Sequence, residues 1–236
     1  MSRFHVALNF MTTIIYIAFA IAPILIILGL IILKVTFKVS NWVNIRNAIF
    51  LGMISAVLVL IANYMADMRW HGEYRNLKRI VVFVFIIIAF SAEFGKYLAL
   101  RLAFYKLKTF EGPIEGIIYG IFISLGYAAV TVVLFGFDLI GTPRMKDFET
   151  FLVLYPFANI VFSTAMGYFL GMGKLRKNTL IDNATGIFVA TFFHGLFYFS
   201  YVTSDLRLQI FIGAGFVLIT AILIYRAVKL RKNKEN

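Results

Sequence analysis

The segment "IVVFVFIIIAFSAEFGKYLALR", Ile80 to Arg101, decides the fold class of this chain. Its first eleven residues carry no polar side chain. A helix needs about 20 mostly apolar residues to cross a bilayer, and this segment is long enough to supply them. A carboxylate, Glu93, and an ammonium, Lys96, follow three residues apart inside the same run. The segment therefore predicts a membrane helix that carries two charges where hydrocarbon is expected.

The whole chain has the composition of a polytopic membrane protein. Of its 236 residues, 61% are hydrophobic and 14% are charged, whereas a soluble domain is nearer half apolar and a quarter charged. The net charge of +12 comes from short basic clusters between apolar segments. This pattern favours contacts with anionic lipid headgroups and argues against nucleic acid as a partner. The chain has no cysteine, which excludes disulfides, thiolate metal sites and a cysteine nucleophile.

Seven segments are long and apolar enough to be membrane helices. We expect them at about residues 11–33, 48–66, 80–103, 114–137, 151–171, 184–202 and 208–230. The connecting pieces are short, so we expect a single all-α membrane domain over residues 1–236, a helical bundle of about seven spans. Strands are not expected, because an open sheet leaves backbone groups unsatisfied in lipid.

Basic residues predict the orientation of the bundle, because they gather on the cytoplasmic side. The connections after the first, third, fifth and seventh segments hold fourteen of the 23 Lys and Arg residues, and the other side holds eight. This predicts a cytoplasmic C-terminus and an N-terminus outside. The cluster "RNLKR", Arg75 to Arg79, lies on the poorer side, so a different number of spans stays an alternative.

The polar side chains inside the predicted spans are candidate functional residues. Glu93 and Glu115 are the acidic residues clearly inside a span, and His194 is the one histidine there. Asn159 contributes an amide one helical turn from Ser163. Ionisable groups in a bilayer are costly and usually face a protein interior or a water-filled cavity. If these helices are adjacent, their polar groups form one chamber.

Each of these residues also has a purely structural interpretation. Glu93 and Lys96 are one helical turn apart and can simply neutralise each other. Glu115 lies near the start of its helix and can serve the helix dipole alone. A lone interior His194 is more often hydrogen-bonded than catalytic, and Asn159 can be an interhelical hydrogen-bonding group.

Small residues recur every four positions in two predicted helices. The longer stripe is Gly112, Gly116, Gly120, Ser124 and Ala128, and the shorter one is Ser163, Gly167 and Gly171. Such stripes let neighbouring helix backbones approach closely. We therefore expect these two helices at the heart of the bundle, beside the polar positions.

Four stretches, taken in order, resemble the PrsW-type intramembrane proteases, relatives of the CAAX prenyl proteases. "AEFGKYLALR" resembles the E-E-x-x-K segment of that family, and Glu115–Phe135 is similar to its D-G-x-x-Y-G segment. Asn159–Leu175 looks like the helix that ends in M-G-Y-x-L-G, and "HGLFYF" resembles the late H-G-x-x-D helix. The resemblance covers residues 80–201, the PrsW-like core, and implies a bacterial inner-membrane protein.

The resemblance implies cleavage of membrane-associated proteins by an activated water molecule. It assigns Glu93 as the base, His194 as a proton relay or ligand, and Asn159 to the oxyanion. The cofactor stays unknown: a divalent metal would have Glu93 and His194 as ligands, with Glu115 as a candidate third, which is a thin set.

The glycine and small-residue positions of the family pattern are retained, whereas several of its ionisable positions are not. Lys96, Glu115 and Tyr119 occupy supporting or substrate-binding positions, with Glu115 in place of an aspartate. Five positions at which the family carries carboxylates, an amide or a histidine hold other residues. They are Ala92, Thr131, Val132, Asn159 and Tyr198.

Three functions stay open, and the sequence favours the first. It is a PrsW-like protein with a degenerate site, which binds membrane-embedded protein segments with weak or no proteolysis. The second is an active intramembrane endopeptidase that uses Glu93 and His194. The third is a transporter or channel that uses Glu93, Lys96 and Glu115. The motifs of P-loop ATPases, zincins and α/β-hydrolases are absent from the sequence.

Overall fold

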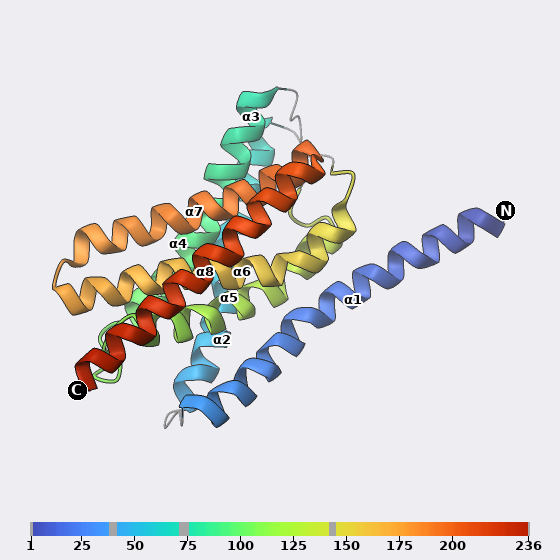
Figure 1. Cartoon of the computed structure of the whole chain (residues 1–236). Helices are drawn as coiled ribbons and strands as arrows, with labels where there is room; N and C mark the ends of the chain where they lie inside the picture. Colours follow the sequence, from blue (N-terminus) through green and yellow to red (C-terminus); the bar gives the residue numbers. More distant parts are fainter. Residues whose placement is uncertain (1, 38–41, 71–75, 142–144, 236) are drawn as a thin grey trace.

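Helices make up the regular structure of the chain in the computed structural model, which describes residues 2–37, 42–70, 76–141 and 145–235 (Figure 1). Within these ranges there is no strand. Side chains are described for residues 13–35, 42–70, 76–141 and 145–233. The elements are α1 (Ser2–Ile32), the π-helix η1 (Leu33–Phe37), α2 (Trp42–Trp70), α3 (Leu77–Val82), the π-helix η2 (Phe83–Phe90), α4 (Ser91–Ala103), α5 (Pro113–Gly136), α6 (Phe148–Arg176), α7 (Thr179–Thr203) and α8 (Leu206–Glu235).

The prediction of a polytopic helical bundle is confirmed. Among the described residues, six helical stretches are long and apolar enough to cross a membrane. They are Thr13–Val35, Trp42–Trp70, Pro113–Gly136, Phe148–Arg176, Thr179–Thr203 and Leu206–Asn233. The remaining predicted segment, residues 80–103, is also helical, but it is divided among α3, η2 and α4, which follow one another without a break.

Local sequence explains where several helices begin and end. Pro113 opens α5 at its first turn, where the missing N–H has no intrahelical acceptor in any case. Lys177 ends α6 in the left-handed conformation, with a φ of 60°, and α7 begins two residues later. Asp205 precedes α8, and its Oδ1 accepts from the backbone N–H groups of Arg207 and Leu208 at 2.9 and 3.3 Å.

The two predicted small-residue stripes face each other between α5 and α6. Three pairs meet, and they step along the two helices in opposite directions. They are Gly112 with Gly171, Gly116 with Gly167, and Gly120 with Ser163. A Cβ atom added to Gly116 or Gly167 would collide with the backbone of the other residue. The close backbone approach that the stripes predict is therefore present.

Helix α5 has a second close neighbour in α2. A Cβ atom on Gly52 would collide with the carbonyl oxygen of Ile123, and one on Gly126 with that of Ile49. In α5 and in α6, 67% of the apolar 18-residue stretch that could cross a membrane is buried inside the protein. In α1 and in α8, the buried share of the corresponding stretch is 11%. Thus α5 and α6 form the centre of the bundle, and α1 and α8 lie at its periphery (Figure 1).

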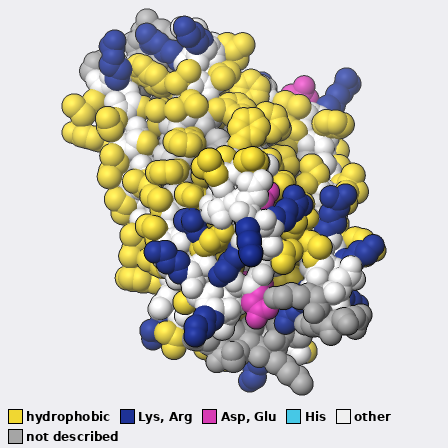
Figure 2. Space-filling view, turned by 90° about the vertical axis from the view of Figure 1, so that its left-hand side faces the viewer, with side chains coloured by type: hydrophobic (Ala, Val, Ile, Leu, Met, Phe, Trp, Pro, Cys, Tyr) yellow, Lys and Arg dark blue, Asp and Glu magenta, His cyan; other side chains and the backbone are white. Residues whose placement is uncertain are grey.

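One end of the bundle carries many of the basic residues. The α4–α5 connection, the α6–α7 turn and the C-terminal part of α8 lie together there, at the left in Figure 1. Lys174 Nζ joins two of these parts by donating to the carbonyl oxygens of Tyr105 and Leu107 at 2.6 and 2.9 Å. Figure 2 looks onto this end and shows Lys and Arg side chains across it. The orientation stays a prediction, and some of its residues lie outside the described side chains: Arg3, Lys38, Arg75, Arg144 and Lys234.

Candidate functional site

Four of the predicted site residues converge from three helices. Glu93 and Lys96 lie on α4, Asn159 on α6 and His194 on α7, and at most 1% of each is exposed. Glu93 Oε1 accepts from Lys96 Nζ at 2.6 Å and from His194 Nδ1 at 2.8 Å. Lys96 Nζ also donates to Asn159 Oδ1 at 2.8 Å. We call these four side chains the buried cage.

Close helix contacts position the cage. Glu93 and Lys96 are one turn apart, so both point to the same side of α4. Next to His194, Gly195 has no side chain, and a Cβ there would collide with the ring of Phe85 on η2. The glycine therefore lets η2, which runs directly into α4, approach α7 closely enough for the carboxylate to reach the imidazole.

Aromatic rings surround the charges. Lys96 Nζ lies 4.9 Å from the ring centroid of Tyr127 and 5.8 Å from that of Phe162. These are cation–π distances. Phe162 also stacks on His194, with ring centroids 4.8 Å apart and an angle of 17° between the planes. The ammonium is thus held by a carboxylate, an amide oxygen and two π faces.

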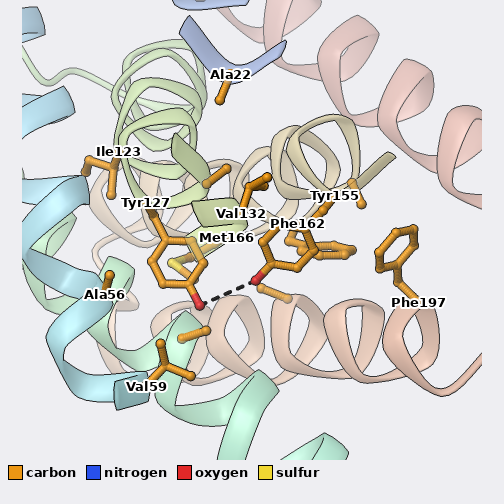
Figure 3. Close-up of a cluster of buried hydrophobic side chains, with 14 of the residues drawn as sticks. Ala22, Ala56, Val59, Ile123, Tyr127, Val132, Tyr155, Phe162, Met166 and Phe197 are labelled. Carbon is orange, nitrogen blue, oxygen red and sulfur yellow. Dashed lines mark hydrogen bonds between the residues drawn. The ribbon is translucent and has the colours of Figure 1, made fainter. Parts of the chain in front are cut away.

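Two tyrosines extend the polar network, and sequence reasoning missed both. The Tyr155 hydroxyl lies 3.3 Å from His194 Nε2 and donates to the Tyr127 hydroxyl at 3.4 Å, the contact drawn as a dashed line in Figure 3. Asn159 Nδ2 donates to the Tyr155 carbonyl oxygen at 2.9 Å, so the amide oxygen faces Lys96. The one available signal was spacing, because Tyr155 lies one turn before Asn159 on α6.

The two carboxylate oxygens of Glu93 differ. Oε1 accepts two hydrogen bonds, whereas Oε2 is buried and has no hydrogen-bond partner among the described residues. Most buried polar atoms in proteins are paired, so an exception calls for an explanation. Oε2 retains the capacity to accept a proton or a hydrogen bond.

Glu115 and Tyr119 do not join the cage. Tyr127 is the α5 residue whose ring faces Lys96. Glu115 precedes Tyr127 by twelve residues, which is about 18 Å along a helix axis. Glu115 instead forms an ion pair of 3.7 Å with Arg231 on α8. Tyr119 stacks on Phe104, with ring centroids 4.6 Å apart. Both residues support the basic end of the bundle.

The cage offers two side chains of the types that bind metals, Glu93 and His194. The third ligand expected from the sequence, Glu115, lies elsewhere, and the described part of the chain holds no group of three or more His, Cys, Asp or Glu suited to a metal ion. Catalytic zinc sites have three protein ligands and an open position. The residues present therefore do not fit such a site.

Several positions that differ from the family pattern are filled by buried groups. Ala92 is 0% exposed. Thr131 Oγ1 donates to the carbonyl oxygen of Tyr127, in its own helix, at 2.9 Å. The Tyr198 ring lies against Phe151, with centroids 5.2 Å apart. The helices are thus tightly packed at these positions.

Comparison with known proteins identifies the family. A family model described as PrsW family intramembrane metalloprotease matches residues 40–227. The chain is 27% identical to "Protease PrsW" of Oceanobacillus iheyensis over 215 residues, 90% of this chain and 94% of the relative. It is 26% identical over 126 residues to "Protease PrsW" of Clostridioides difficile, 53% of this chain and 51% of the relative. It is 32% identical over 120 residues to "Protease PrsW" of Halalkalibacterium halodurans, 48% of this chain and 51% of the relative. No solved structure matches the chain. With the helical bundle and the four ordered motifs, these matches show that the chain belongs to the PrsW family of intramembrane metalloproteases.

Proposed function

We propose that this PrsW-family protein binds membrane-embedded segments of other proteins and hydrolyses them weakly or not at all. The observation that carries the proposal is the buried cage. In it, the Glu93 carboxylate is bound on the same oxygen by an ammonium and an imidazole.

The cage leaves few groups free for water activation. A general base must reach the proton that it removes, but Glu93 Oε1 already accepts from Lys96 and His194. Ala92 supplies no second carboxylate. Asn159 turns its oxygen to Lys96 and donates to a backbone carbonyl of its own helix, so its amide is engaged on both sides. These contacts favour slow or absent chemistry.

An apolar groove between α6, α7 and α8 supports the binding part of the proposal. Its cavity volume is about 220 Å³, and its lining includes Phe157, Phe197, Phe216 and Val217. Phe216 touches Phe162 at a centroid distance of 5.8 Å, and Phe162 stacks on His194. The rings of Phe216 and Phe162 therefore lie between the groove and His194 of the cage.

The α8 wall of the groove has room for a hydrophobic segment. Nothing lies within 4 Å of where a Cβ of Gly213, a lining residue, would be. Val217 is 70% exposed, on a helix whose length and apolarity suit a membrane. A segment that lies within the bilayer can meet this groove without leaving hydrocarbon.

One observation favours a second candidate, an active endopeptidase. Glu93 Oε2 is buried without a hydrogen-bond partner among the described residues and can take a proton. With His194 beside the same carboxylate, a single acid and a single imidazole would serve as the water-activating pair. The relatives named as proteases are consistent with this chemistry in the family.

Photo-crosslinking combined with a cleavage assay tests the proposal. A photoreactive amino acid replaces Val217 in the groove and, as a matched control, Tyr16, which is 65% exposed on α1. The probes are single-span membrane proteins with a fluorescent protein at one end and an epitope tag at the other. Crosslinking shifts the probe on a gel, and cleavage separates its two labels.

We expect crosslinks from position 217 well above those from position 16, little cleavage, and the same crosslinks in Glu93→Gln. Equal crosslinking at both positions would refute segment binding. Efficient cleavage that is lost in both Glu93→Gln and His194→Ala would establish the endopeptidase instead. Cleavage gained by Ala92→Glu with Asn159→His would support a degenerate site.

A further inference from the structure

The family description implies a bound metal ion, but the side chains of the cage are not arranged to bind one. A divalent ion bound by Glu93 and His194 would need the carboxylate oxygen and a lone pair of the imidazole to point at it. Instead, Lys96 Nζ lies 2.6 Å from Glu93 Oε1, and His194 Nδ1 lies 2.8 Å from the same oxygen. An ammonium has three donors and no acceptor, so it cannot be a ligand in this state.

Lys96 occupies the Oε1 side of Glu93, the side that also faces His194. Its Nζ contacts a carboxylate oxygen, an amide oxygen and the faces of Tyr127 and Phe162. Oxygen ligands and π faces are the groups that proteins use to surround a positive charge. With 1% of its side chain exposed, Lys96 is enclosed rather than extended toward the bilayer surface.

We propose that Lys96 is the resident cation of this centre and that its ammonium excludes a divalent metal from the cage. A second positive ion would lie within a few ångströms of the first, in a buried site where like charges repel strongly. The ammonium supplies one charge and hydrogen-bond donors, and it offers no open coordination position. The inference goes beyond the proposed function, because metal content does not depend on whether segments are bound or cut.

Elemental analysis of the full chain tests the proposal directly. The protein is purified in detergent without a histidine tag, equilibrated with Zn²⁺, Mn²⁺ or Co²⁺, and desalted. His5 and His71, the other two histidines, are replaced by Gln throughout, so that His194 is the one remaining imidazole. We expect far less than a stoichiometric amount of each metal. A stoichiometric metal that is lost in Glu93→Gln and in His194→Gln would overturn the proposal.

A charge-removing variant tests the mechanism of exclusion. Lys96→Gln keeps Glu93 and His194 but removes the ammonium, so we expect Co²⁺ to bind at least about tenfold more tightly than to the chain that keeps Lys96. Visible absorption of Co²⁺ reports the binding, and Lys106→Gln, an exposed lysine, is the matched control. Equal Co²⁺ affinity in folded Lys96→Gln and in the starting protein would refute exclusion by the ammonium. The elemental analysis of the chain that keeps Lys96 decides the metal content even if this variant does not fold.

The same preparations separate this inference from the proposed function. A protein that holds stoichiometric metal and still crosslinks segments at position 217 would refute the resident cation and leave segment binding intact. A metal-free protein whose crosslinks at position 217 do not exceed the control would refute segment binding and leave the resident cation intact.

Discussion

Replacing Lys96 by Met would break the ion pair at the centre of the cage. Met has a similar length and no charge, so the change removes the ammonium while filling much of its volume. Glu93, at 0% exposure, would keep His194 as a partner and lose the closer contact of 2.6 Å. Removing one member of a buried pair leaves an uncompensated charge, and the loss in the free energy of unfolding is about 3–5 kcal/mol.

Removing both charges should cost much less than removing one. In Glu93→Gln with Lys96→Met, no buried charge of the pair remains, and replacing a whole buried pair by neutral groups is often close to neutral in stability. We therefore expect the double variant to recover most of the loss, with a coupling energy of about 2–3 kcal/mol. The recovery distinguishes the cost of an unpaired charge from a loss of packing.

The measurement is reversible unfolding in mixed micelles of rising SDS content, followed by circular dichroism. Lys106→Met is the matched control, because Lys106 is an exposed lysine of the α4–α5 connection, and we expect a change within about 0.5 kcal/mol. A loss below about 1 kcal/mol for Lys96→Met, or a double variant less stable than Lys96→Met, would refute the buried pair.

Three further predictions concern the packing and the edges of the site. Gly167→Ala places a Cβ against the backbone of α5 and should destabilise the protein by about 1–3 kcal/mol, whereas Gly213→Ala, with open space around it, should not lower the SDS midpoint. Tyr155→Phe removes the hydroxyl 3.3 Å from His194 Nε2; ¹⁵N spectra of histidine-labelled protein should show a shifted Nε2 resonance, and an unchanged one would exclude the contact. Glu115→Gln removes a partly exposed ion pair of 3.7 Å and should change the free energy of unfolding by about 1 kcal/mol or less; a larger loss would assign Glu115 a role in the core.

Much of the fold and part of the site could be predicted from the sequence, because lipid imposes strong constraints. Apolar runs long enough to span a bilayer have few alternatives to a helix. Charges in such runs are expensive unless they find partners in the protein interior, which explains why Glu93, Lys96 and His194 were expected to face one chamber and do meet. The glycine stripes identified the central helices for a similar reason, since close backbone approach requires small residues.

The remaining features carry no comparable signal. Tyr155 and Tyr127 have large apolar rings, and such residues are common in the interior of a bundle whether or not their hydroxyls serve a site. Glu115 matches a family position, but its distance along α5 separates it from the cage. The π-helical stretch η2 contains neither Gly nor Pro, so its local sequence does not mark the change in helix type.

The backbone contact between α5 and α6 has a consequence for motion. Where Gly112 meets Gly171 and Gly116 meets Gly167, there is no side chain that can change rotamer to let the helices slide or separate. We therefore expect α5 and α6 to move as one rigid body, with Asn159 carried on it. Helix α8 is attached mainly through side chains such as Phe216 and has open space beside its glycines. We therefore expect an opening that admits a hydrophobic chain toward His194 to come from a displacement of α8 against this pair.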